Sequence, residues 1–265
     1  AGADCLVAIG GGSAIGIAKG IARETSLPIV AVPTTYGGSE MTPIFGMTQG
    51  GIKQTGRDPR VQPGIVIYDP ELTLSLPAAT TANSGMNALA HCMEALYAPD
   101  RNALTTAAAR QGLLFLFDAL PVLADSPLDL PAREAALQGA WLAGFALGRV
   151  QMGLHHKLCH AIGGLFDLPH AETHAALLPY TCAYNRQALP SNEQDLPERL
   201  LSLARACGAA MSLSAIGFPA NLVAQAAEVA TTSEYPNPIA VTRDGVATLL
   251  RAAVDGDESY VRSSD

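Results

Sequence analysis

Residues 5–33, CLVAIGGGSAIGIAKGIARETSLPIVAVP, determine the fold expected for the first part of this chain. Cys5 to Ile9 is an apolar run typical of a buried strand, and Ile29 to Val32 is a second one. Between them, Ala14 to Thr25 carries small and apolar residues at helical spacing. The segment therefore predicts a strand, a helix and a second strand parallel to the first, with a glycine-rich turn between the first strand and the helix.

The turn itself suggests an anion site. Gly10, Gly11 and Gly12 permit a tight turn and close approach of a phosphate, and Ser13 is placed to cap the helix. The spacing matches neither GxGxxG nor a P-loop, so a glycine turn without a ligand remains an alternative. Residues 33–40, PTTYGGSE, follow the second strand at the edge where such sheets bind ligands; a simple turn-rich loop is the other interpretation.

The remaining chain divides into a short α/β part and a long helical part. Gln62 to Tyr68 predicts a third strand, after which β-branched runs disappear. We expect a partial dinucleotide-binding domain at 1–77 and an all-helical catalytic domain at 78–265. Because the chain opens almost directly on a strand, the α/β domain is expected to lack its first strands. Helices are predicted at 79–97, 103–124, 132–162, 171–186, 195–207, 219–231 and 242–254.

Composition excludes several classes of protein. The formal charge of −8, with only 16 basic residues in 265, gives no electrostatic footprint for nucleic acid. No uninterrupted apolar run reaches the roughly 20 residues that cross a bilayer, and the start does not resemble a secretory signal. The five cysteines form no CxxC pair, which favours reduced thiols. These features predict a cytoplasmic protein with small-molecule ligands.

Histidines provide the strongest functional signal. His156, His160 and His170 lie four and ten residues apart, and Asn87 and His91 repeat the spacing of four, which places two side chains on one helix face. Imidazole serves as a metal ligand and as a proton donor, so both roles are open. A zincin motif is excluded because Lys157, not glutamate, follows His156. No elbow turn marks a Cys159–His160 nucleophile pair, and His174 is expected to be structural.

Several long motifs resemble one known family. These are GGGSAIGIAK (10–19), PTTYGGSEMTP (33–43), IYDPELTLSLP (67–77), SGMNALAHCMEALYA (84–98) and LHHKLCHAIGGLFDLPHAETHAALLPY (154–180). Together they look like the iron-containing alcohol dehydrogenase superfamily, and specifically like its maleylacetate reductases. The resemblance implies a dehydroquinate-synthase-like architecture and the reduction of maleylacetate to 3-oxoadipate by NADH or NADPH in aromatic-compound degradation. It also implies a dicarboxylate substrate and a homodimer.

The resemblance also implies roles for individual residues. His160 matches the histidine beside the nicotinamide, and His91, His156 and His170 match the three histidines that bind iron or zinc in metal-dependent relatives. The residues that would border the cofactor are Gly11, Gly12, Ser13, Thr34, Thr35, Ser39, Lys53 and Leu76.

One departure from the family pattern concerns the metal. Asn87 stands where metal-dependent relatives carry an aspartate, and Gly16 stands where alcohol dehydrogenases carry another. A neutral amide removes one negative charge from a divalent cation site. We therefore expect Fe²⁺ or Zn²⁺ to bind weakly or not at all.

The hypothetical mechanism follows from that expectation. Hydride addition to the carbon–carbon double bond leaves negative charge on the ketone oxygen, which His156 and His160 would stabilise, with Asn87 as a neutral donor. Lys157, Arg149 and Arg101 are candidates for binding substrate carboxylates. The alternatives are a metal-dependent alcohol or glycerol dehydrogenase, a dehydroquinate-synthase-like lyase, and an inactive fragment.

Overall fold

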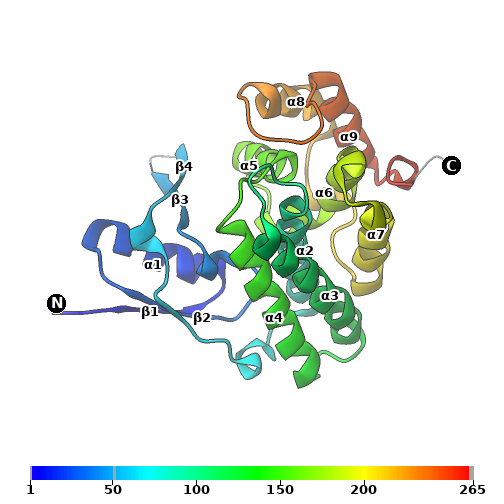
Figure 1. Cartoon of the computed structure of the whole chain (residues 1–265). Helices are drawn as coiled ribbons and strands as arrows, with labels where there is room; N and C mark the ends of the chain where they lie inside the picture. The colour runs from blue at the N-terminus through cyan, green and yellow to red at the C-terminus, as the bar shows by residue number, and fades with distance from the viewer. Residues whose placement is uncertain (1, 50–51, 263–265) are drawn as a thin grey trace.

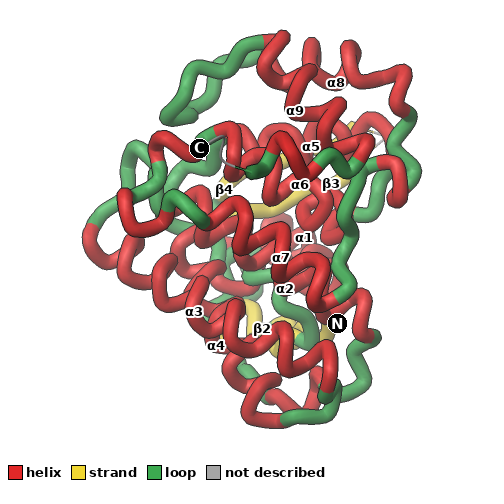
Figure 2. The backbone as a smooth tube through the Cα atoms, turned by 90° about the vertical axis from the view of Figure 1, so that its right-hand side faces the viewer, coloured by secondary structure: helices red, strands yellow, loops and turns green. Residues whose placement is uncertain are grey.

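The structure is a computed structural model that describes residues 2–49 and 52–262. A small α/β unit lies at one side and a larger helical body at the other (Figure 1). Apart from the strands of the α/β unit, the described backbone is mainly helical (Figure 2). The predicted order, an α/β part followed by a helical part, is confirmed.

The α/β unit is built around the glycine turn. Strand β1 (Leu6–Gly10), helix α1 (Gly12–Thr25) and strand β2 (Ile29–Pro33) follow one another, and the two strands pair in parallel with Leu6 opposite Ile29. Strand β5 (Ile65–Val66) extends the sheet in the order β1-β2-β5 and is shorter than expected. Gly10 has a φ of +143°, a conformation that favours glycine, and so allows the sharp turn into α1.

Helix α1 covers one face of this sheet. Its residues Ile15, Ala18 and Ala22 are buried there together with Ile29. Large apolar side chains elsewhere in the sheet remain exposed, among them Ile9 at 62% and Ile65 at 58%. Within the described residues, the sheet is therefore packed as a core on one side only.

An antiparallel hairpin was missed by sequence analysis. Strands β3 (Ile44–Gln49) and β4 (Ile52–Arg57) pair with each other and not with the parallel sheet. The segment lacks a regular alternation of apolar and polar residues, which is why it gave no strand signal.

The helical body begins with α2, whose first residue is Ala78. The helices are α2 (Ala78–Ala95), α3 (Ala103–Asp125), α4 (Leu130–Leu147), α5 (Leu154–Phe166), α6 (His170–Tyr184), α7 (Leu196–Cys207), α8 (Val223–Thr231) and α9 (Arg243–Asp255).

The single helix predicted over 132–162 is wrong, because the chain leaves the helix between α4 and α5. Tertiary contacts explain this break. The Arg57 guanidinium donates to the carbonyl oxygens of Leu147 and Gly148 at the end of α4. A carboxylate from α2, that of Glu94, accepts the N–H of Gly153 just before α5.

Two hydrophobic clusters form the interior of this body. The first is built mainly from α2, α3, α4 and α7, and the second mainly from α5, α8 and α9; α6 contributes to both, and α7 adds Leu201 to the second. Helix α3 is apolar and long enough to span a membrane by length and composition alone, but it belongs to the first cluster and packs against α2 and α4. The two clusters meet where α2 of the first packs near α5 of the second, the helices that carry His91 and His156.

Candidate active site

A cleft of about 1200 Å³ lies where the α/β unit meets the helical body. The glycine turn contributes Gly12 and Ser13, and α5 contributes His156 and His160. Asn87, His91 and His170 also line it. The histidines predicted from sequence and the phosphate-binding turn thus face the same space.

The glycine-turn end of the cleft fits an anion. Gly11 is the N-cap of α1 and provides no side-chain cap; Ser13 lies inside the helix, so the prediction that it caps the helix is wrong. A Cβ atom on Gly12 would meet nothing within 4 Å. Because Gly12 and Ser13 line the cleft, the N-terminus of α1 borders it, and helix N-termini are places where phosphate binds.

The other residues predicted to border the cofactor fall into three groups. Thr35 and Ser39 line the cleft, whereas Thr34 and Leu76 are not among its lining residues. Leu76 instead packs against the first hydrophobic cluster. Lys53 lies in β4 opposite Thr48, and its side chain is outside the described part of the structure.

A buried lysine holds the loop that carries Ser39. Lys19 Nζ donates to the carbonyl oxygens of Ser39 at 2.6 Å, Thr42 at 2.8 Å and Ile44 at 2.7 Å. Burial lowers the Lys19 pKa to about 8. The lysine thereby ties α1 to the loop after β2, a role that sequence analysis did not assign to it.

His91 and His156 meet across the seam between α2 and α5. His91 Nδ1 lies 2.8 Å from His156 Nε2, and the two rings stack with centroids 4.9 Å apart. His91 Nε2 lies 3.1 Å from the carbonyl oxygen of Gly37. On the other side, His156 Nδ1 lies 2.6 Å from Glu94 Oε2. Every ring nitrogen of this pair therefore has a partner.

The Gly37 carbonyl determines where the protons lie. A carbonyl oxygen only accepts, so His91 carries its proton on Nε2. If both rings are neutral, His91 Nδ1 accepts from His156 Nε2, and His156 Nδ1 must then accept from a protonated Glu94.

Burial favours this neutral arrangement. It lowers the pKa of His91 well below its usual value and that of His156 to about 3, and it raises the pKa of Glu94 to about 7. In this form neither imidazole has an N–H left for a substrate.

Glu94 is the functional residue that sequence analysis missed. It is fully buried, and its carboxyl group accepts the N–H groups of Gly153 at 3.1 Å and His155 at 2.8 Å. It therefore fixes the first turn of α5 as well as the His156 ring. The available signal was a glutamate three residues after His91, in an otherwise apolar helical run.

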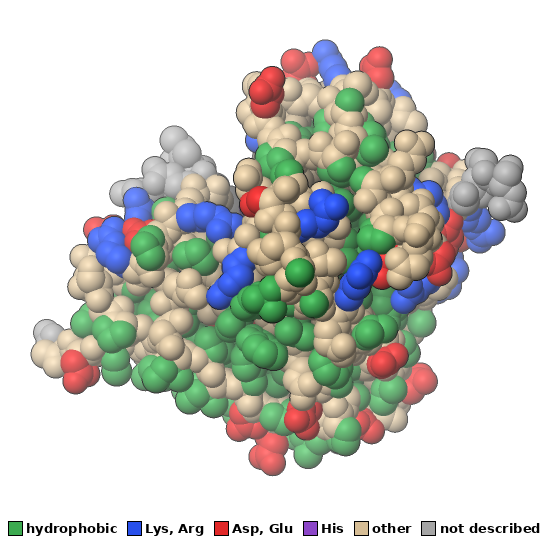
Figure 3. Space-filling view, in the orientation of Figure 1, with side chains coloured by type: hydrophobic (Ala, Val, Ile, Leu, Met, Phe, Trp, Pro, Cys, Tyr) green, Lys and Arg blue, Asp and Glu red, His purple; other side chains and the backbone are tan. Residues whose placement is uncertain are grey.

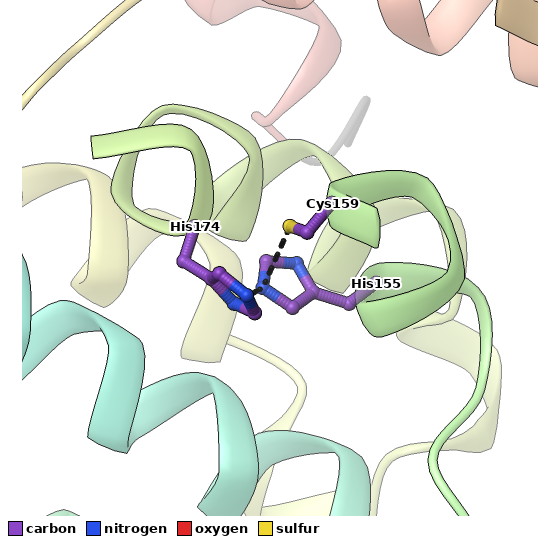
Figure 4. A group of neighbouring side chains, drawn as sticks. All are labelled: His155, Cys159 and His174. Atoms are coloured by element: carbon purple, nitrogen blue, oxygen red, sulfur yellow. Dashed lines mark hydrogen bonds between the residues drawn. The ribbon is translucent and has the colours of Figure 1, made fainter. Parts of the chain in front are cut away.

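A second buried network lies behind the first. Thr181 Oγ1 donates to a carbonyl one turn earlier in α6, so it accepts from His155 Nδ1 at 2.8 Å. His155 Nε2 then accepts from His174 Nδ1 at 2.9 Å, with Cys159 Sγ 3.6 Å away (Figure 4). The His170 ring lies 4.5 Å from that of His174. All six histidines of the chain thus form one continuous cluster.

The family's metal-ligand set is a poor fit for a tightly held divalent cation. Asn87 supplies a neutral oxygen, and the facing nitrogens of His91 and His156 share a proton. Among the described residues, the three potential ligand atoms found within 4.8 Å of one another belong to His155, Cys159 and His174, not to His91, His156 and His170. The donor set contains no carboxylate to balance the ion's charge.

Comparison with known proteins identifies the family. Residues 81–254 match the C-terminal domain of the Fe-containing alcohol dehydrogenase family, and residues 1–70 match the iron-containing alcohol dehydrogenase model. The chain belongs to the iron-containing alcohol dehydrogenase family. The resemblance inferred from sequence motifs is confirmed.

Several relatives resemble this chain over most of its length. A maleylacetate reductase of Burkholderia cepacia is 51% identical over 264 residues, which cover 96% of this chain and 75% of that protein. The crystal structure of maleylacetate reductase from Agrobacterium tumefaciens superposes with a TM-score of 0.93 at 48% identity, covering 96% of this chain and 75% of that one. A 1,3-propanediol oxidoreductase structure gives a TM-score of 0.86 at 29% identity, with 94% and 77% covered.

Proposed function

We propose that this protein is an NAD(P)H-dependent maleylacetate reductase, which reduces the carbon–carbon double bond of maleylacetate to give 3-oxoadipate. The observation that carries the proposal is the shared cleft: Ser13 of the phosphate-binding turn and His160 of α5 line the same space. Identity of 51% to a maleylacetate reductase, over almost all of the chain, supports this substrate.

The N-terminus of helix α1 forms the end of the cleft that we assign to the cofactor. Its first amides, at Gly12 and Ser13, would hold the pyrophosphate, with the Thr35 and Ser39 side chains beside it. A reduced nicotinamide supplies the hydride when it is bound. Residues of the helical body must then stabilise the negative charge that develops on the substrate.

That charge appears on the ketone oxygen once hydride has added to the conjugated double bond, and it must be stabilised by hydrogen-bond donors. His160 is exposed on the cleft wall formed by α5, and it is our candidate for donating the proton to the carbon next to the ketone, which restores the carbonyl group and completes the reduction. Asn87 provides a neutral amide in the same cleft. His91 and His156, with every nitrogen engaged, support this wall rather than reach the substrate.

The reaction is proposed to need no tightly bound divalent cation, because the ligand set is neutral. We also propose that the protein is a cytoplasmic homodimer, that its substrate is a dicarboxylate, and that it binds neither nucleic acid nor a membrane.

One assay tests the proposed function. The purified protein is incubated with maleylacetate and either NADH or NADPH, and the loss of reduced-nicotinamide absorbance is followed. Consumption of cofactor with formation of 3-oxoadipate is expected, and the faster cofactor gives the preference. Oxidation of an alcohol or glycerol that requires added Fe²⁺ or Zn²⁺ would instead indicate a metal-dependent dehydrogenase. Metal- and NAD⁺-dependent turnover of a dehydroquinate-synthase substrate would indicate the lyase, and no turnover with any substrate would indicate an inactive fragment.

A further inference from the structure

Of the three basic residues considered for substrate binding, Lys157 alone lines the cleft. Arg149 stacks on Phe145, with its guanidinium carbon 3.8 Å from the ring centroid, and Arg101 donates to the carbonyl oxygen of Ala98. Lys157 lies on α5 between His156 and His160, one turn before the latter. Its position places a cation beside the reacting part of the cleft.

The opposite side of Lys157 is formed by the segment between α8 and α9. Lys157 Nζ donates to Ser233 Oγ at 2.7 Å and lies 5.7 Å from the centre of the Tyr235 ring. The Tyr235 hydroxyl is buried and has no hydrogen-bond partner among the described residues, and Tyr235 is one of the residues that line the cleft. A buried hydroxyl without a partner is costly, and a ligand oxygen would satisfy it.

This segment is held in place independently of any ligand. Asn237 and Asn185 exchange two amide hydrogen bonds, of 3.0 Å and 2.8 Å, and Asn237 Oδ1 also accepts the N–H of Leu154. Gly153 lets the segment approach, since a Cβ atom there would lie 3.0 Å from the Pro236 carbonyl oxygen. Ser233 and Tyr235 are therefore positioned against α5 before substrate arrives.

Charge in this region favours an anion. No carboxylate of the described residues lies within ion-pair distance of Lys157, and two of its three N–H groups remain after the bond to Ser233. Several basic side chains lie across the middle of the face in Figure 3, while acidic ones lie along its lower edge and also at its top and right. Lys157 therefore offers an anion in the cleft a positive charge, although the net charge of the chain is −8.

From these contacts we propose that Lys157 and Tyr235 form a carboxylate subsite, which binds one of the two carboxylates of the substrate and restricts the enzyme to diacids. The subsite rests on the proposed function and deepens it. Lys157 Nζ provides a charge-assisted hydrogen bond and the Tyr235 hydroxyl a second donor, while Ser233 orients the lysine. The subsite binds and orients the substrate and takes no part in proton transfer.

The test compares wild type, Lys157→Met, Lys157→Arg and Arg149→Met. Arg149→Met is the matched control, because it removes one positive charge outside the cleft. Each protein is assayed with maleylacetate and with two monoacid analogues that keep the enone and lack one carboxylate each. Loss of one charge-assisted hydrogen bond should raise the KM of Lys157→Met for maleylacetate about 10- to 100-fold, with kcat little changed. Thermal unfolding of each variant verifies that the fold is kept.

Selectivity provides the second readout. Wild type should prefer maleylacetate to one of the two monoacids by about the same 10- to 100-fold factor, and Lys157→Met should lose that preference. Lys157→Arg should recover part of it, and Arg149→Met should behave as wild type. An unchanged KM and an unchanged preference in a folded Lys157→Met protein would overturn the subsite while leaving the proposed function standing. If wild type itself does not reduce maleylacetate, both proposals fail.

Discussion

Gly38 and Gly144 lie backbone against backbone, where the loop after β2 crosses helix α4. A Cβ atom on Gly38 would come within 3.0 Å of the Gly144 Cα atom, and a Cβ atom on Gly144 would overlap the Gly38 carbonyl group. Gly38 also has a φ of +76°, which favours glycine. Because Gly37 directly precedes this contact, the same approach brings its carbonyl oxygen to His91.

Replacing Gly144 by alanine should therefore push the loop away from α4. We expect a loss of about 1–3 kcal/mol in the free energy of unfolding, typical of overpacking, together with a lower kcat as the Gly37–His91 bond lengthens. Denaturant unfolding and steady-state kinetics measure both. Gly164→Ala is the control: nothing lies within 4 Å of a Cβ atom there, so it should gain about 0.5–1 kcal/mol.

A valine at Gly12 tests the phosphate site. The position is open, so Gly12→Val should leave the unfolding midpoint nearly unchanged. It should raise the KM for the nicotinamide cofactor about tenfold or more, because the branched side chain screens amides that would bond a charged phosphate. In Gly11→Val the new side chain would also meet Thr35, 3.0 Å from Cβ, so stability should fall as well. Equal cofactor KM values in Gly12→Val and wild type would argue against this phosphate site.

His160→Ala should lower kcat by about 100- to 10,000-fold, the range for loss of a general acid, while circular dichroism and cofactor binding stay as in wild type. A folded variant with undiminished turnover would remove His160 from the mechanism.

The metal prediction concerns Asn87. Treating the wild-type protein with a chelator should leave its activity unchanged, because no carboxylate is present among the predicted ligands. Asn87→Asp should bind Zn²⁺ or Fe²⁺ measurably more tightly in a calorimetric titration, and Asn87→Ala should not. Activity that disappears with the chelator and returns with iron or zinc would show that the interpretation of Asn87 is wrong.

Glu94 predicts a pH dependence of stability. Its pKa is about 7 in the folded chain, against an ordinary value of 4.5, so above pH 4.5 the folded state holds a proton that the unfolded state has lost. The free energy of unfolding from this group should fall as pH rises from about 4.5 to about 7. Glu94→Gln, which cannot ionise, should remove that slope in denaturant titrations across this range. A slope identical to wild type would mean that Glu94 is already ionised at low pH.

Much of the fold was readable from sequence because local signals were sufficient. The glycine turn between apolar runs gave β1, α1 and β2, and alanine- and leucine-rich periodicity gave most helices. The break between α4 and α5 was not readable, since the partners that end and restart the helices, Arg57 and Glu94, lie far away in the chain.

Part of the site could also be predicted from sequence, because helical spacing is a local signal. Helical spacing paired Asn87 with His91 and His156 with His160, and all four line the cleft. Spacing could not show that both nitrogens of His91 and His156 are occupied, because Gly37 and Glu94 reach them through tertiary packing. For the same reason, it could not separate Lys157 from Arg149 as a cleft residue.

The His91–His156 bond joins a helix of the first hydrophobic cluster to a helix of the second. The two nitrogens of this hydrogen bond lie 2.8 Å apart, and the strength of the bond is sensitive to small changes in that distance. Because the bond is buried, its proton exchanges slowly with solvent. The proton chemical shift of this hydrogen bond should therefore report how the helices of the two hydrophobic clusters are positioned relative to each other. A buried substitution in α8 or α9 that moves the second cluster relative to the first should change this chemical shift, although the substituted residue lies far from both histidines.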